Sequence, residues 1–243
     1  MASRTPFAVT CALALSFMIG AAVAAEEEEA ADPLEGKIKL GYLATSGNTE
    51  TSSLNSGFEA TYTVGRWEHK ALATAINASE DDMTTAEAYE LGWKSGWNIT
   101  ERDYLFGQLD WRKDRFGPFD TQFSQTVGYG RRIIDTVAHL LKGEIGAGAR
   151  QSEDQLGVSQ DETIITGGLN YTWKLSETAE FGQLLRAEVG EDNTFSESVT
   201  SITTRLIGGF NLVASYTIRN NSESPAGTEG TDTRTAIALE YGF

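Results

Sequence analysis

Cysteine is almost absent from this sequence. The 243-residue chain has a single cysteine, Cys11, which lies in an apolar stretch near the start. A disulfide within one chain needs two cysteines, so an intramolecular disulfide framework is excluded. A folded domain of this chain must therefore be held together by burial and hydrogen bonds alone.

Histidine is nearly as scarce, because the chain holds only His69 and His139. A serine triad needs a histidine within hydrogen-bond reach of a serine, and neither histidine lies beside a matching motif. The alternating pattern around each histidine predicts that both face outward, near the ends of strands. We therefore expect a protein that is not an enzyme and that has no catalytic, cofactor-binding or metal-binding residues.

Basic residues are also few, since 19 lysines and arginines stand against 35 aspartates and glutamates, giving a formal net charge of −16. Such an acidic chain is a poor partner for nucleic acid. Beyond the first 25 residues no apolar run reaches the roughly 20 residues that a membrane-spanning helix needs.

The start of the chain resembles a secretory signal peptide. Arg4 precedes an apolar run, and the small residues Ala22, Val23, Ala24 and Ala25 follow it. We expect cleavage after Ala24 or Ala25, with residues 1–24 as the signal peptide, 25–34 as an acidic flexible tether and 35–243 as the folded domain. An uncleaved membrane anchor is the alternative. Cleavage would remove the sole cysteine and make the chain more acidic by one charge.

Apolar and polar side chains alternate along almost the whole of residues 37–243. In "YELGWKSGWNI", Leu91, Trp93 and Trp97 fall on one face and Glu90 and Lys94 on the other. Successive side chains of a strand point to opposite sides of a sheet, so this pattern predicts sheet with one apolar and one polar face. Turn signals divide the region into twelve predicted strands, at residues 36–46, 52–64, 67–79, 86–99, 103–114, 119–133, 137–151, 161–175, 179–190, 196–207, 210–221 and 232–243.

The predicted connections alternate between tight turns, such as "VGRW" and "IGGF", and longer loops, such as "SEDDMTTAE" and "SESPAGTEGTD". Outer-membrane barrels have short periplasmic turns, longer outer loops and strands of about 9–11 residues or more. The sequence therefore predicts an all-β fold, a transmembrane antiparallel up-and-down barrel of about twelve strands, with its first and last strands paired. A soluble sandwich or lipocalin-like barrel is the alternative. Two features argue against it: the polar face carries both signs of charge, and Trp67, Tyr104, Phe181 and Phe210 begin strands at one rim, where an aromatic girdle would lie.

The predicted polar face points many charged side chains into the lumen. The candidates are Lys94, Arg112, Arg132, Lys142, Arg150, Arg186, Arg205, Arg219, Arg234, Glu90, Asp110, Glu144, Glu188 and Glu240. They could form a neutralising network that fills and stabilises the barrel. They could also line a narrow aqueous pore that favours small anions or acidic sugars. Twelve strands lie between the filled eight-stranded and the open sixteen-stranded barrels, so both interpretations stay open.

The predicted outer loops are acidic. Their carboxylates include Glu50, Glu80, Asp81, Asp82, Glu153, Asp154, Asp161, Glu191, Asp192, Glu223, Glu229 and Asp232. A solvated rim explains them. A surface protein that binds divalent cations or lipopolysaccharide through these loops, without transport, is the alternative function. The glycines of "GYGRR" and "GAGAR" are not phosphate loops, because no helix follows them; we interpret them as bulges, curvature or close packing with an inward neighbour.

Three segments resemble one bacterial family. They are "GYLATSGNTETS", with Gly41 and residues 45–49, "GYGRRI", with residues 128–131, and the terminal "ALEYGF", with Leu239, Tyr241 and Phe243. The chain is similar over essentially its whole mature length to the salt-induced outer membrane protein family, small Gram-negative barrels without an established activity. The resemblance implies a location in the outer membrane among its lipids and lipopolysaccharide. It also implies that the aromatic-ended terminus is an assembly signal for the barrel assembly machinery.

Overall fold

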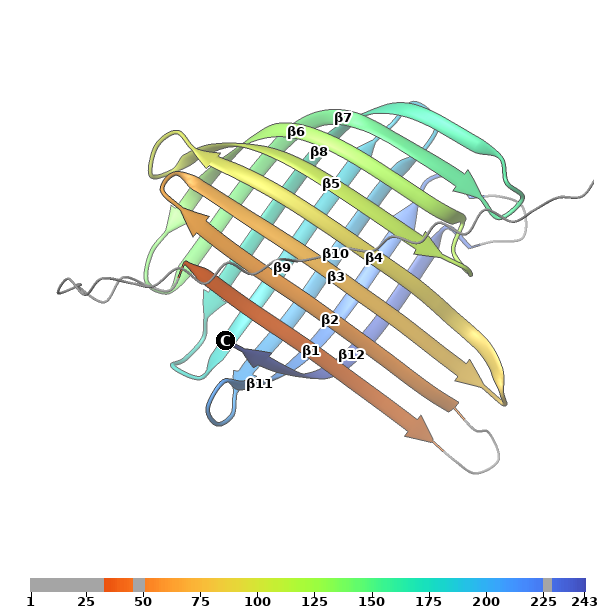
Figure 1. Ribbon diagram of the computed structural model, residues 1–243, viewed down its shortest axis with the longest axis horizontal. Helices are drawn as coiled ribbons and strands as arrows, with labels where there is room; N and C mark the ends of the chain where they lie inside the picture. Colours follow the sequence, from red (N-terminus) through yellow and green to blue (C-terminus); the bar gives the residue numbers. More distant parts are fainter. Residues whose placement is uncertain (1–32, 46–50, 225–228) are drawn as a thin grey trace, which may run out of the picture. The chain divides into compact units, whose positions relative to one another are not determined.

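The computed structural model describes residues 33–45, 51–224 and 229–243, and these form a closed antiparallel barrel of twelve strands (Figure 1). The strands are β1 (Leu34–Thr45), β2 (Thr51–Val64), β3 (Trp67–Glu80), β4 (Met83–Asn98), β5 (Asp103–Asp114), β6 (Phe119–Asp135), β7 (His139–Asp154), β8 (Ser159–Lys174), β9 (Ala179–Val189), β10 (Thr194–Arg205), β11 (Phe210–Asn221) and β12 (Thr231–Gly242). Each strand pairs with its neighbours in sequence order. Among the described residues, no helix is both long enough and apolar enough to cross a membrane.

The barrel closes where β1 pairs with β12, as predicted. Ile38 lies opposite Tyr241 and Leu40 opposite Leu239. Gly36 and Phe243 exchange backbone hydrogen bonds of 2.8 and 2.9 Å at the end of this seam. The seam is short, because its register runs only from Lys37 opposite Gly242 to Leu40 opposite Leu239, and within it the first and last strands pair as a hydrocarbon environment requires.

Two ends of the barrel are distinguished below. The terminal end holds the start of β1, the end of β12 and the connections that follow the even-numbered strands. The far end holds the connections that follow the odd-numbered strands. Figure 1 shows the beginning of β1 and the C-terminus at the same end of the barrel.

The predicted strands agree with the structure to within three residues at every boundary. The connections at the far end differ more. A long loop was expected between β3 and β4, yet Asp81 and Asp82 alone connect them, with φ of 48° and 63°. That left-handed geometry suits a two-residue hairpin turn, and aspartate tolerates it better than most residues. The prediction of a long loop was wrong here because strand pairing continues through the polar residues that suggested a loop.

The apolar face of the sheet points outward. Ile165 on β8 is 62% exposed, and Leu91 and Ile237 are also among the exposed large apolar side chains. Of the described side chains, the largest that are fully buried are Arg150, Ile164 and Asn193. A soluble barrel would bury its apolar face in a core. Here the apolar face is exposed on the outside and polar side chains are buried inside, which confirms the predicted membrane-barrel fold class over the soluble alternative.

The aromatic girdle at the terminal end was predicted correctly for Trp67 and Phe210, which are exposed on the outer face. The prediction for Tyr104 was wrong, because this ring is 7% exposed and lies in the lumen. The parity of β5 explains the position, since Leu105 lies on the outer face and neighbouring positions alternate. Gly130 on β6 leaves the space that the ring fills.

The glycines of β6 are places of close packing. A Cβ at Gly130 would collide with the Tyr104 ring, and one at Gly128 would collide with the Phe106 ring and the Ile145 carbonyl. This confirms the interpretation of "GYGRR" as packing against inward neighbours.

Both histidines lie on the outer face near the terminal end, as predicted. The His69 ring stacks against Trp67 and Trp93 at 5.8 Å, and its Nδ1 lies 2.9 Å from Ser95 Oγ. The His139 ring stacks similarly on Tyr171 and Trp173. The two rings therefore belong to the aromatic girdle.

A charged lumen as the candidate functional site

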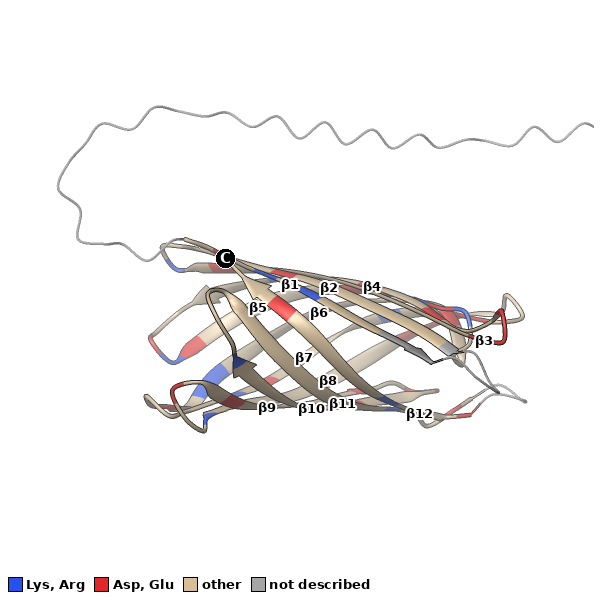
Figure 2. Ribbon diagram, turned by 90° about the horizontal axis from the view of Figure 1, so that it is seen from below, with Lys and Arg blue, Asp and Glu red and all other residues tan. Residues whose placement is uncertain are grey.

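The lumen contains a cavity of about 520 Å³. Charged positions contribute to it from many strands, and Figure 2 shows basic and acidic positions distributed along the barrel wall as well as in the connections. Ten of the predicted lumen residues line the cavity: Lys94, Arg112, Arg132, Lys142, Arg150, Arg186, Glu90, Asp110, Glu144 and Glu188.

The other four predicted lumen residues lie outside the cavity lining. Arg219 forms ion pairs with residues that do line it, and the Arg234 charge lies within electrostatic range of Arg219. Glu240 is buried near the terminal end, where it pairs with Lys39 at 3.1 Å. Arg205 is the last residue of β10 and is exposed.

A network of ion pairs crosses the lumen in its far half. We call it the arginine band, and it consists of Glu90, Asp110, Arg112, Arg150, Glu162, Arg186, Glu188, Glu197 and Arg219. Its positions lie at least seven residues from the terminal end of their strands.

Arg150 is the most buried member of the band, with its side chain 2% exposed. Its guanidinium contacts Glu162, donates to Glu188 at 3.2 Å and donates to the backbone oxygen of Asn193 at 2.5 Å. Glu162 also accepts the backbone N–H of Asn193 at 3.3 Å. A guanidinium has five donors in a planar fork, so one arginine can join two carboxylates and a backbone carbonyl.

The band contains pairs between neighbouring strands and two pairs between strands that are not neighbours. Arg219 on β11 contacts Glu90 on β4 at 2.5 Å, and it contacts Glu197 on β10 at 2.6 Å. Arg186 on β9 contacts Asp110 on β5 at 3.0 Å. The contacts of Arg219 with Glu90 and of Arg186 with Asp110 span the lumen rather than follow the sheet, so the band ties separate parts of the barrel wall together.

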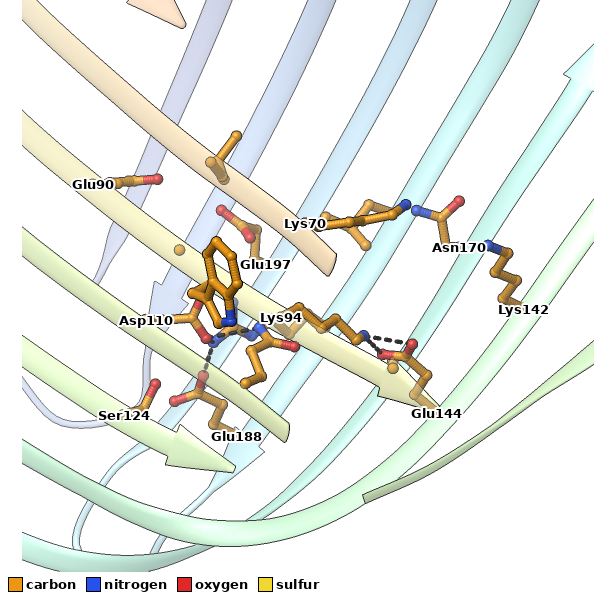
Figure 3. Close-up of a pocket in the computed structure, with 18 of the residues that line it drawn as sticks. Lys70, Glu90, Lys94, Asp110, Ser124, Lys142, Glu144, Asn170, Glu188 and Glu197 are labelled. Carbon is orange, nitrogen blue, oxygen red and sulfur yellow. Dashed lines mark hydrogen bonds and ion pairs between the residues drawn. The ribbon is translucent and has the colours of Figure 1, made fainter. Parts of the chain in front are cut away.

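Cavity-lining residues in the terminal half form a second region, which we call the lysine vestibule. It consists of Glu68, Lys70, Lys94, Arg132, Lys142, Glu144 and Asn170. The Lys94 ammonium donates to both Glu144 oxygens at 2.5 and 2.6 Å (Figure 3). Tyr104 donates to the same carboxylate at 2.6 Å. Lys94 and Glu144 are each 25% exposed and the Lys70 side chain is 41% exposed, whereas the band ranges from 2% at Arg150 to 27% at Asp110, so on average the vestibule is the wetter region.

Lys94 is paired with Glu144, but the other cations of the vestibule are less well neutralised. Arg132 donates to Asn98 Oδ1 at 3.1 Å and to the backbone oxygen of Glu101 at 2.8 Å, which are uncharged acceptors. Lys70 contacts Glu68 at 3.6 Å. Among the described residues, no carboxylate lies within ion-pair distance of Lys142.

Sequence reasoning missed several lumen residues, including Glu68, Lys70, Glu197 and Tyr104. The pattern of β3 explains the first two. The small residue Ala71 lies at the outward parity of His69, whereas the large apolar Leu72 lies at the same parity as Glu68 and Lys70. On this strand the outward face carries small residues and the lumen face carries a large apolar one, so the usual contrast that marks the polar face is lost. The shared parity of Glu68 and Lys70 was the one signal in the sequence that could have placed both in the lumen.

The other predicted features lie at the ends of the barrel. Leu239, Tyr241 and Phe243 are exposed on the outer face at the terminal end. Residues 46–49 of the first resembling segment, and Glu50, fall outside the described residues. Within the described ranges, no group of three or more histidine, cysteine, aspartate or glutamate side chains is arranged to hold a metal ion.

Comparisons with known proteins agree with this architecture. Residues 38–243 match a family described as "Protein of unknown function, DUF481". The chain is 33% identical over 210 residues to the uncharacterized protein YdiY of Escherichia coli (strain K12), a match that covers 86% of this chain and 83% of that protein. The COG4313 outer membrane channel from Pseudomonas putida F1 has a similar structure, with a TM-score of 0.52 and 10% identity, covering 89% of this chain and 100% of that one. At that identity the structural likeness shows the fold alone.

Proposed function

The chain belongs to the DUF481 family of proteins of unknown function, and from that premise we propose that it is an integral outer-membrane barrel whose lumen is a narrow, charge-lined passage for small anions. The outward apolar face supports a membrane location, since it would otherwise be exposed to water. In such barrels the short turns and the termini face the periplasm, so the terminal end would face the periplasm and the far end the outside.

The observation that carries the proposal is the cavity itself. Its wall is charged on opposing strands, and side-chain exposure rises from the arginine band toward the lysine vestibule. A passage of this kind selects by the sign of the charges along it and by its width. The incompletely paired lysines and Arg132 would favour anions, and the band would be the narrowest part.

Conductance in planar bilayers tests the proposal. Wild-type protein should show small discrete steps with anion selectivity. The double variant Glu90→Ala/Arg219→Ala removes one cation and one anion from the band, so the net charge is unchanged while the passage widens. Its conductance should therefore be larger.

The matched control is Lys113→Ala/Asp120→Ala, which also removes an ion pair, of 3.1 Å, and neither residue lines the cavity. Its conductance should equal that of wild type. Absence of steps in wild-type protein that still shows heat-modifiable gel migration would reject the channel and leave a structural barrel. Equal conductance of the band variant and wild type would reject the band as the narrowest part.

Two further expectations from the sequence stay predictions. One is that the acidic far end binds divalent cations or lipopolysaccharide. Calcium binding would appear as a change of tryptophan emission on titration with calcium, and an unchanged emission would reject calcium binding. Induction by salt would appear as a rise in transcript after a salt upshift.

A further inference from the structure

Lys142 is the least neutralised cation of the lysine vestibule. It lies on β7 directly opposite Asn170 of β8 in the sheet register. The charge of Lys70, which comes from β3 across the lumen, acts on it with the same sign, and so does the charge of Arg132. The opposing charges are those of Glu68 and Glu144.

Both of those carboxylates are already engaged. Glu144 accepts two hydrogen bonds from Lys94 and one from Tyr104. Glu68 lies beside Lys70 on the same strand at 3.6 Å. Glu59 also lines the cavity, but it is not among the charges that act most strongly on Lys142. The space between Lys70 and Lys142 therefore has a positive charge that the vestibule itself does not balance.

The surroundings of these two ammonium groups are partly polar and partly apolar. Figure 3 shows Lys70 and Lys142 pointing toward Asn170. Thr172, Leu72 and Leu140 line the same cavity. Two cations and an amide can bind carboxylate oxygens, and the leucines offer contact to a short carbon skeleton.

We propose that Lys70, Lys142 and Asn170 form a binding site for a small organic carboxylate in the vestibule. The proposal rests on the proposed function, because the ligand must reach the lumen from the terminal end. The carboxylate would take the place of the missing counter-ion, and the carbon skeleton would lie against the leucines. Inorganic phosphate shares the charge but has no apolar part, so it should bind more weakly.

Calorimetric titration of the full mature chain in detergent tests the site without measuring transport. Succinate should bind saturably to wild type. Lys142→Gln should weaken succinate binding about tenfold or more, because it removes a charge-assisted contact. Asn170→Asp should weaken it comparably, because a carboxylate then occupies the site. Lys142→Arg keeps the charge and should bind within a few-fold of wild type.

The matched control is Lys39→Gln, which also removes one lysine charge but from a residue paired with Glu240 and outside the cavity lining. It should bind succinate like wild type. Heat-modifiable gel migration reports that each variant is folded, and the uncharged analogue succinamide should not bind wild type.

Three results would overturn the site: no saturable binding to wild type, an unchanged affinity in folded Lys142→Gln, or phosphate binding as tightly as succinate. The outcome is separable from that of the channel. Saturable binding without conductance would support the carboxylate site and reject the passage. Conductance without saturable binding would support the passage and reject the carboxylate site.

Discussion

The arginine band and the lysine vestibule occupy one lumen, yet they are built on different principles. In the band every arginine contacts a carboxylate, and Arg150 is almost completely buried. In the vestibule three of the four cations are lysines, exposure is higher, and Arg132 and Lys142 have no carboxylate within ion-pair distance among the described residues.

The difference follows from the chemistry of the two side chains. A guanidinium is weakly hydrated and can bind several acceptors at once, so it suits a dry network. An ammonium is strongly hydrated and keeps its charge available where water reaches it. Burying charges is tolerable only when each is well paired. The band therefore has the composition of a structural element, and the vestibule that of a surface that meets solutes.

Removing one cation from each region tests whether the two regions differ in their contribution to stability. Arg150→Met leaves Glu162 and Glu188 buried without their shared partner, and it should lower the free energy of unfolding by about 3–5 kcal/mol. Lys94→Met leaves Glu144 partly exposed and still bonded to Tyr104, and it should cost about 1 kcal/mol or less. Urea unfolding in lipid vesicles measures both, and equal costs would contradict the distinction.

A smaller effect should come from the wall of the vestibule. Gly130→Ala places a methyl group against the Tyr104 ring, so it should destabilise the barrel by about 1–3 kcal/mol and weaken the bond from Tyr104 to Glu144. Gly107→Ala is the control, because nothing lies within 4 Å of its added carbon. The same unfolding assay compares them. A neutral Gly130→Ala would show that Tyr104 is not held in place by close packing.

The smallest effect is expected from salt. The Debye length falls from about 10 Å at 0.1 M to about 3 Å at 1 M ionic strength. The exposed vestibule charges should be screened, so anion selectivity measured by reversal potential should decline as KCl rises. The buried band is screened far less, so the stability loss of Arg150→Met should persist in high salt. Selectivity that is independent of salt would place the selective charges in the band instead.

The fold was largely predictable from the sequence, because apolar and polar residues alternate in nearly every segment that forms a strand. The strand limits, the outward apolar face and the outward positions of His69 and His139 follow from alternation and turn residues. The two-residue hairpin at Asp81 and Asp82 could not be predicted in this way. Polar residues at the far end are as compatible with strands that extend beyond an apolar layer as with a loop.

The inside of the barrel was less predictable. Parity placed Lys94, Arg112 and Glu144 on the lumen side, but it gives no information about which strands face each other across the lumen. The contact between Arg219 and Glu90 joins β11 to β4, which no local pattern encodes. Tyr104 was misplaced because an aromatic at the start of a strand is typical of a girdle, whereas Gly130 on the neighbouring strand makes room for it inside.

Accessibility of single cysteines tests the division of the lumen most directly, because the mature chain is expected to lack cysteine and each introduced thiol would be the only one. Lys142→Cys places a thiol in the vestibule, and Ser124→Cys places one beside Arg150 and Asp110, where Ser124 is 6% exposed. With a charged, membrane-impermeant thiol reagent, Lys142→Cys should be modified completely while Ser124→Cys stays unmodified in the folded protein. Equal rates of modification at the two positions would contradict a wet vestibule bounded by a dry arginine band.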